Sequence, residues 1–374
     1  MPQANEADNL RVNALITEPR PPIEWSVASP LDLERLRNRW AETEACPVVC
    51  ASREDGIDQS WLGFDIRTYL RGEQSAGRLS VHSIVIAPGA GLPPHYHDDR
   101  ETFLIVVEGT PEIGVGSLVE TAARFTLAYA PPRTRFSIRN TSDAPVWVNL
   151  VYQSAGLERA FADAHELWAH KKENDFTPYR AVLSRYGFRF DDALLENDSL
   201  TNSEMPPVEF EFSGEGDLEA LREKLFERRA VPRLVHTPES EVALDGPDPG
   251  FRKRVLGGDE SGGTAMLNFV SRIPPAPKHY QPTEEEMFFI LDGQLAMTCG
   301  TADVILERGA LAFAPRNCTH AFGPPAPDID HKFMTMNTPG GHEHAMAALR
   351  AKAKAGLTDQ EFRAFSAAGG FIIQ

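Results

Sequence analysis

The chain has 374 residues, enough for two ordinary domains, with 42% hydrophobic and 24% charged residues and a formal net charge of −17. Such an acidic surface repels phosphate backbones and anionic lipid headgroups, so we expect neither nucleic acid nor a membrane as partner. No apolar run approaches the roughly 20 residues of a membrane helix, the start MPQANEADNL lacks signal-peptide features, and the four cysteines form no CxxC pair. These features predict a cytoplasmic location.

An internal repeat organises the chain. Over the central part of each half, an offset of 184 positions places His95 on His279 without a gap. The same offset matches Tyr96 with Tyr280, Gly109 with Gly293, Arg124 with Arg308 and Pro131 with Pro315. Upstream the offset becomes 185, and downstream it becomes 183. So many matches at nearly one offset indicate a tandem duplication.

The first copy is predicted to span residues 23–196, after an N-terminal arm at 1–22. A helix is expected at 31–43, because leucines recur at helical spacing and Ser29-Pro30 suits an N-cap and first turn. Short β-branched and aromatic runs follow, and a second helix is expected at 157–170. The clearest of these strand-like runs are 81–86, 102–107 and 146–152.

The second copy repeats this order. A polar, turn-rich linker at 197–207 precedes it, and the copy itself is predicted at 208–374, with helices at 218–229 and 342–354. Many short strands broken by glycine and proline are typical of an antiparallel barrel or sandwich. We therefore predict a mainly β protein made of two tandem barrels with flanking helices.

Polar residues of the second copy form a two-part motif. His279-Tyr280-Gln281 is followed by Glu286 and Gly293, and further on come Gly309, Pro315 and His320. This pattern resembles the cupin signature, in which HxH, Glu and Gly precede Gly, Pro and His. The resemblance implies double-stranded β-helix (jelly-roll) barrels. The tandem arrangement is similar to bicupins of the quercetin-dioxygenase-like kind.

The spacing of these residues predicts a metal site. Residues two apart on a strand point to the same face, so His279 and Gln281 both face the barrel interior. Glu286 and His320 come from later strands. Two imidazoles and a carboxylate suit Fe(II) best and would also accept Mn, Ni or Zn. Gln281 stands where the family has a histidine, and its amide oxygen is a weaker ligand.

The first copy shows the complementary pattern. His95 and His97 retain HxH, but the ungapped register places Thr102 opposite Glu286 and Phe136 opposite His320. Glu101 is one position early, which turns its side chain to the other face unless a bulge rotates it inward. We interpret His95 and His97 as a pair of histidines in a polar pocket, with a vestigial second metal site of His95, His97 and Glu101 as the alternative.

A substrate pocket is predicted beside the second site. Strand alternation turns Phe288 and Ile290 to the side of Glu286, and with Ala312 and Ala314 they would form an apolar wall. His331 is a further candidate for this pocket. His342 and His344, at the start of a helix, are expected on the surface.

The leading functional hypothesis is an Fe(II)-dependent oxygenase acting on a small aromatic or enolisable chelating substrate. Glu286 would act as ligand and as catalytic base. The alternatives are a metal-dependent isomerase, lyase or decarboxylase, and a small-molecule binder without enzymatic activity. Exchange of the N-terminal segment would support a homodimer.

Overall fold

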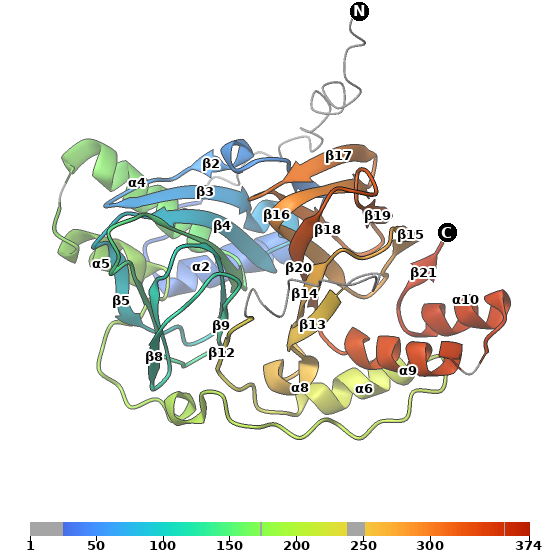
Figure 1. The fold of residues 1–374 in the computed structure, drawn as a ribbon. Coiled ribbons are helices and arrows are strands. Elements are labelled where there is room, and N and C mark those ends of the chain that lie inside the picture. The colour runs from blue at the N-terminus through green and yellow to red at the C-terminus, as the bar shows by residue number, and fades with distance from the viewer. Residues whose placement is uncertain (1–24, 173, 238–250, 355) are drawn as a thin grey trace, which may run out of the picture.

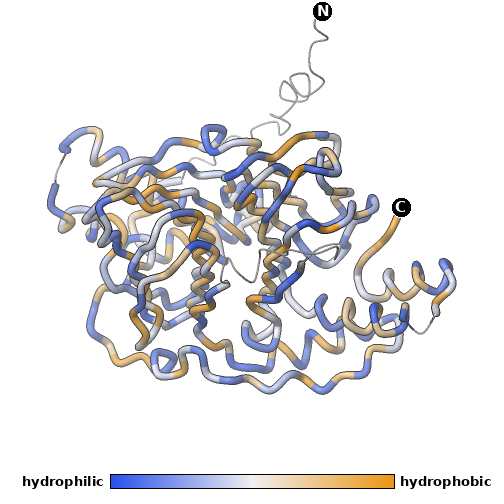
Figure 2. The backbone as a smooth tube through the Cα atoms, in the orientation of Figure 1, coloured by the Kyte–Doolittle hydropathy of each residue, from blue (hydrophilic) through white to orange (hydrophobic). Residues whose placement is uncertain are grey.

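A computed structural model describes residues 25–172, 174–237, 251–354 and 356–374. The predicted arm at 1–22 lies outside these residues. Figure 1 shows two β-barrels side by side, with helices on their outer sides. Hydrophobic residues concentrate in the strands, and hydrophilic residues follow the loops (Figure 2). None of the helices in the described part of the chain has the length and apolar character needed to cross a bilayer.

The first barrel is built from antiparallel strands. Its sheets have the orders β12-β9-β6-β11-β4-β3-β2 and β5-β10-β7-β8. These strands are β2 (Ile57–Asp58), β3 (Phe64–Leu70), β4 (Leu79–Ile86), β5 (Gly91–His95), β6 (Glu101–Glu108), β7 (Glu112–Val115), β8 (Leu118–Thr121), β9 (Leu127–Ala130), β10 (Phe136–Arg139), β11 (Val146–Gln153) and β12 (Arg233–Val235). Its helices are α2 (Pro30–Ala41), α3 (Gly72–Ser75), α4 (Leu157–Lys171) and α5 (Thr177–Arg185), with short 3-10 turns η1 (Arg53–Asp55) and η2 (Glu196–Leu200).

The second barrel repeats this plan around one long strand, β16, which pairs with β17, β18, β19 and β20. Its strands are β13 (Phe251–Leu256), β14 (Met266–Ser271), β15 (Ala276–Tyr280), β16 (Glu285–Cys299), β17 (Ala302–Glu307), β18 (Leu311–Ala314), β19 (His320–Gly323), β20 (His331–Thr338) and β21 (Ile372–Ile373). Its helices are α6 (Asp217–Phe226), α8 (Gly258–Ser261), α9 (His342–Lys354) and α10 (Asp359–Ala368).

The structure confirms the predicted helices and fold class. Helices α2, α4, α6 and α9 cover the four expected segments within a few residues at their ends. Helix α2 begins as expected, since the Ser29 side chain accepts a hydrogen bond from the backbone N–H of Asp32 and Pro30 occupies the first turn. The chain is a mainly β protein with two tandem cupin barrels.

Each barrel borrows one strand from the other copy. Strand β1 (Val48–Cys50), from the first copy, pairs with β18 of the second barrel. Strand β12, from the second copy, pairs with β9 of the first barrel. The two pairings are related by the internal repeat, so the exchange is reciprocal. The predicted domain limits therefore separate the two copies in the sequence, although each barrel contains one strand from the other copy.

A hydrophobic interface joins the two barrels. Along β6, Phe103, Ile105 and Val107 face this interface, whereas Leu104 and Val106 fill the interior of the first barrel. The side chains of strand β16 alternate in the same way, so successive residues of each strand pack into two different hydrophobic cores. The interface cluster includes Phe125, Leu127, Phe269, Met287, Phe289, Leu311 and Met336.

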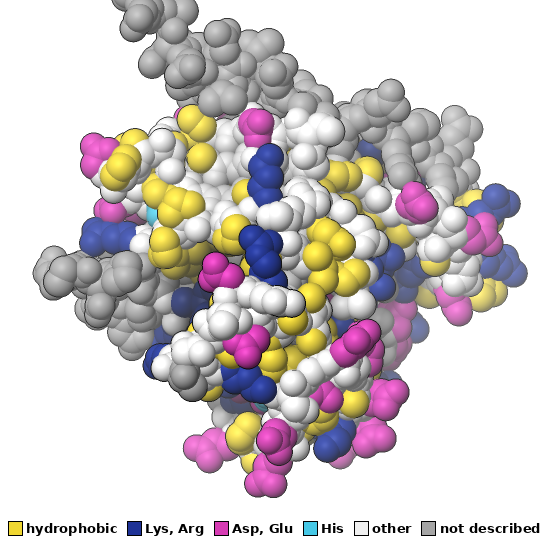
Figure 3. Space-filling view, turned by 90° about the vertical axis from the view of Figure 1, so that its right-hand side faces the viewer, with side chains coloured by type: hydrophobic (Ala, Val, Ile, Leu, Met, Phe, Trp, Pro, Cys, Tyr) yellow, Lys and Arg dark blue, Asp and Glu magenta, His cyan; other side chains and the backbone are white. Residues whose placement is uncertain are grey.

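Polar contacts also cross this interface. Tyr69 donates its hydroxyl to the Gly309 carbonyl at 2.6 Å, and Arg124 Nη2 donates to the Leu291 carbonyl at 3.0 Å. The repeat-related Arg308 forms an ion pair with Glu108 of the first barrel at 2.5 Å. Charged groups elsewhere are interspersed, as Figure 3 shows for the face on the side of the second barrel.

Candidate metal centre

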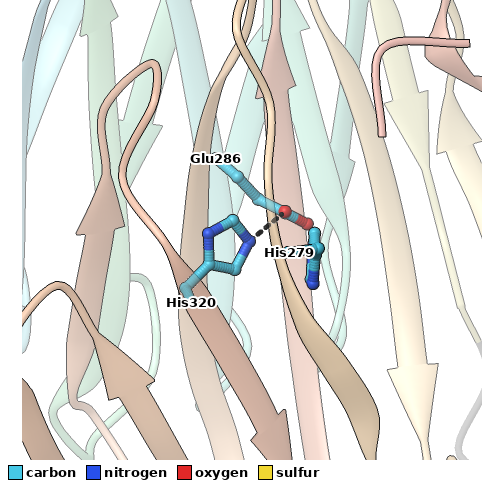
Figure 4. A group of neighbouring side chains, drawn as sticks. All are labelled: His279, Glu286 and His320. Carbon is cyan, nitrogen blue, oxygen red and sulfur yellow. Dashed lines mark hydrogen bonds and ion pairs between the residues drawn. The ribbon is translucent and has the colours of Figure 1, made fainter. Parts of the chain in front are cut away.

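Strands β15, β16 and β19 bring three predicted ligands together inside the second barrel. His279 on β15 lies directly opposite His320 on β19, and Glu286 begins the inward-facing residues of β16. One ligand atom from each of these residues lies within 4.8 Å of the other two, and all three side chains are buried. Figure 4 shows them converging on one point.

The hydrogen bonds of the two histidines fix which nitrogen faces the centre. His279 Nδ1 donates to the Pro277 carbonyl at 2.7 Å, and His320 Nδ1 donates to the Cys318 carbonyl at 3.0 Å. A carbonyl only accepts, so each Nδ1 carries a proton and each Nε2 is directed to the centre. Carbonyl partners of this kind orient metal-binding imidazoles.

Glu286 is the charged hub of the site. Its Oε2 accepts a hydrogen bond from Gln281 Nε2 at 2.9 Å and lies 3.1 Å from His320 Nε2. Burial alone would raise its pKa, but the contacts with His320, His279 and Gln281 together lower the pKa of Glu286 to about 2. The carboxylate is therefore ionised at neutral pH, the form that binds metal.

The pKa values of the two histidines move in opposite directions. Burial and then the neighbouring His320 lower the pKa of His279 to about 4, so this imidazole is neutral. Burial also opposes protonation of His320, but the hydrogen bond and charge of Glu286 outweigh it and raise the pKa of His320. A neutral imidazole and a carboxylate are thus available at neutral pH, and the second imidazole is held by the carboxylate itself.

The cavity above these residues differs from the predicted apolar pocket. Its volume is about 320 Å³, and Phe288, Ile290, Ala312 and Ala314 are absent from its lining. Those four residues are fully buried in the barrel core beneath the site, where Phe288 packs against Phe322 and His320. The predicted wall was wrong because side chains on the correct face lie too deep to meet a ligand. The lining comprises Arg252, Met266, Asn268, Ile273, Pro274, Ala276, His279, Gln281, Glu286, Phe322, Thr335, Asn337, His342, Met346, Arg350 and Phe371.

His342 belongs to this cavity and not to the surface. It is only 6% exposed, and its Nδ1 donates to the Gly369 carbonyl at 3.1 Å and lies 3.7 Å from Glu284 Oε1. The surface expectation was wrong because α10 and the C-terminal segment cover the start of α9. His331 does not line this cavity, and its Nε2 accepts a hydrogen bond from the backbone N–H of Ile273 at 3.1 Å.

The first barrel has the same strand register as the second but lacks two of its ligand residues. Phe136 lies opposite His95, as His320 lies opposite His279. Thr102 pairs with Ala130 and Tyr152, as Glu286 pairs with Ala314 and Asn337. The sequence offset therefore gave the correct structural equivalence.

Glu101 does not join His95 and His97. Strands β6 and β11 pair without a shift at this end, so no bulge turns the side chain inward. Its Oε1 accepts hydrogen bonds from Tyr129 at 2.6 Å and from Thr264 of the second copy at 2.8 Å. The assignment of Glu101 to the vestigial site was wrong, and its place is the interface between the barrels.

Aromatic residues enclose the two histidines of the first barrel. The Phe188 ring lies 4.9 Å from the His95 ring and 4.6 Å from the His97 ring, between centroids. Burial lowers the pKa of His95 to about 4 and that of His97 well below its ordinary value. Both Nε2 atoms are buried without a hydrogen-bond partner among the described residues.

Comparisons with known proteins agree with the repeat. The cupin domain family matches residues 82–152 and 269–330, the central strands of each barrel. No curated protein matches the chain.

Three solved structures are similar to this chain in fold. The protein YlbA from E. coli is 13% identical, with 81% of this chain and 96% of that one covered and a TM-score of 0.48. Procruciferin, an 11S globulin from Brassica napus, is 10% identical over 80% and 85%, with a TM-score of 0.49. A W96Y oxalate decarboxylase from Bacillus subtilis is 13% identical over 85% and 86%, with a TM-score of 0.46. At this level the likeness carries no information on chemistry.

Proposed function

We propose that the protein is a metal-dependent oxygenase of the quercetin-dioxygenase-like bicupin kind, with Fe(II) held by His279, Glu286 and His320. The observation that carries the proposal is the convergence of these three ligand atoms within 4.8 Å, where His279 and Glu286 line a cavity of about 320 Å³. Two imidazoles and one carboxylate leave coordination positions for substrate and dioxygen. Mn, Ni and Zn accept the same donors, so the donor set alone does not select iron.

The residues of this chain fit such an ion. Both imidazoles have Nδ1 committed to a carbonyl, and Glu286 is ionised. When bound, Fe(II) would supply Lewis acidity and a redox partner for dioxygen.

Gln281 and Glu286 have distinct roles in this proposal. Gln281 holds one oxygen of Glu286 through its amide N–H, which restricts the carboxylate to one orientation. Glu286 would accept the proton of a chelating substrate hydroxyl, as a carboxylate within hydrogen-bond reach of that group does. His342 lines the same cavity and is oriented by the Gly369 carbonyl, so it offers a second polar group to the substrate.

The test combines metal analysis with oxygen uptake. We expect about one metal ion per chain, lost in His320→Ala and retained in the double variant His95→Ala, His97→Ala, whose folding is checked by its melting temperature. Oxygen uptake with small catechols and enediols should require Fe(II) and disappear with His320→Ala. Metal retained by His320→Ala but lost by the double variant would assign the centre to the other barrel. Metal-dependent turnover without oxygen uptake would favour an isomerase, lyase or decarboxylase, and bound metal with ligand but no turnover would favour a binding protein.

A further inference from the structure

Two arginines stand at the mouth of the cavity above the metal centre. Arg252 comes from β13 and Arg350 from α9, and both also line the adjoining groove toward solvent. Both residues are exposed, and Arg252 is electrostatically coupled to the positive charge of Arg350 and to the carboxylate of Glu286. The two guanidinium groups are therefore close enough to repel each other, and Arg252 is within electrostatic range of the site.

The carboxylates of the cavity and groove are engaged elsewhere. Glu286 is bound by Gln281 and lies against His320. Glu343, in the groove, accepts hydrogen bonds from the backbone N–H groups of Gly258 at 2.5 Å and Gly341 at 2.9 Å. Among the described residues, neither Arg252 nor Arg350 forms an ion pair with a carboxylate, in a protein whose net charge is −17.

Buried amides add further donors to the same space. Asn337, on β20, is 2% exposed, and its Nδ2 has no hydrogen-bond partner among the described residues. A buried N–H without a partner is destabilising, so it is normally satisfied by water or a ligand. Asn268 also lines the cavity, and among the described residues its Nδ2 donates only to the sulfur of Met266, at 3.6 Å.

We propose that the substrate of this site is a small organic carboxylate, whose carboxylate group is bound by Arg252 and Arg350 while its other end reaches His279, Glu286 and His320. Planar guanidinium groups bind carboxylates through paired, charge-assisted hydrogen bonds. The inference rests on the proposed function for the metal-binding end of the substrate. Phe322, Met346 and Phe371 would contact the apolar body of the ligand.

The test uses two probes that differ only in the carboxylate, catechol and 3,4-dihydroxybenzoate. Their dissociation constants are measured by anaerobic titration calorimetry with Mn(II)-loaded protein, so that no turnover interferes. The acid should bind at least tenfold more tightly than the diol, the effect of one charge-assisted hydrogen bond. In the double variant Arg252→Gln, Arg350→Gln the preference should fall to within about twofold, with catechol binding unchanged.

Lys354→Gln is the matched control, because it removes one positive charge from an exposed position of α9 outside the cavity lining. It should retain the preference. Equal binding of the two probes by the unmodified protein, or a preference that survives the double variant, would overturn the inference. Tighter binding of phenyl phosphate than of benzoate would also overturn it, since the site would then be one for phosphate esters.

A third protein, His320→Ala, separates this inference from the proposed function. If both hold, His320→Ala weakens both probes but keeps the preference for the acid. Binding that is indifferent to metal and to His320, with the preference intact, would reject the metal-dependent function and leave the arginine site standing. Binding that needs His320 but shows no preference for the acid would reject the arginine site and leave the metal-dependent function standing.

Discussion

The two barrels share one architecture but keep different parts of one ligand set. The first retains His95 and His97 and has Phe136 at the later position, whereas the second retains His279, Glu286 and His320 and has Gln281 in place of the second histidine. The strand registers coincide, so the backbone presents the same positions in both copies. The difference shows that a barrel of this kind keeps its shape when its ligand residues change. The hydrogen-bond ladder between the strands, and not the metal ligands, determines where each side chain points.

Access also separates the two barrels. In the second, His279 and Glu286 line a cavity bordered by arginines and amides, and His320 is fully buried. In the first, Phe188 lies against both histidines, and Phe136 and Tyr152 occupy neighbouring interior positions. Within the described residues, the two histidines of the first barrel are thus enclosed by aromatic rings and have no carboxylate beside them.

The prediction with the largest expected effect restores the two ligand positions that the first barrel lacks. Thr102→Glu with Phe136→His places a carboxylate and an imidazole at positions that face His95 and His97. We expect a second metal ion per chain by elemental analysis, a change from no detectable binding to stoichiometric binding. The melting temperature should rise with added Mn(II) more than that of the parent, because burying these groups without metal is unfavourable.

A matched control is the single variant Phe136→His, which lacks the carboxylate and should bind no second ion firmly. A folded double variant that still holds one ion would contradict the equivalence of the two interiors.

A second prediction compares Glu101 and Glu285, the repeat-related glutamates that each contact the other copy. Burial raises the pKa of Glu101 to about 7 from its ordinary value of 4.5, against the lowering effect of hydrogen bonds from Tyr129 and Thr264. The folded chain keeps this proton up to about pH 7, whereas the unfolded chain loses it near pH 4.5. The contribution to stability is therefore complete below pH 4.5 and is lost as the pH rises to about 7.

Glu101→Gln keeps the acceptor oxygen and removes the titration. Between pH 5 and pH 8, urea denaturation should show the parent losing about 2 kcal/mol of unfolding free energy relative to the variant. The control is Glu285→Gln, the repeat-related position, where Arg78 and Arg316 each approach within 2.8 Å of the carboxylate. That change should destabilise the protein at pH 8. Parallel pH profiles for parent and Glu101→Gln would disprove the buried titration.

The smallest expected effect concerns Gln281, the one ligand position at which the second barrel is poorer than the first. Gln281→His supplies an imidazole in place of the amide, and we expect the dissociation constant for Mn(II) to fall about tenfold, or about 1.4 kcal/mol. Turnover should decrease, because the imidazole fills a position that substrate needs. Weaker metal binding with full turnover would place the amide outside the coordination sphere.

Sequence alone predicted the repeat, the barrels and the residues that meet at the centre, because period-2 alternation and one nearly constant offset determine them. It missed the cavity wall. Arg252 and Arg350 come from a strand and a helix that are about 100 positions apart, and no local pattern links them. His342 was misplaced for a similar reason, since its burial depends on α10 packing over it. The alternation of side chains likewise predicts which face of a strand a residue occupies but not how deep it lies in the barrel. For this reason Phe288 was assigned to a ligand pocket.

The reciprocal exchange of β1 and β12 has a consequence for the protein as a folding unit. Strand β18, which lies beside the strand of Glu286, completes its hydrogen bonding with β1, a segment encoded about 260 residues earlier. A half-chain cut at the linker would leave this edge open in the second barrel and the β9 edge open in the first. Exposed strand edges invite aggregation. Each copy therefore covers a strand edge of the other barrel, and we expect the two halves to unfold in one cooperative transition.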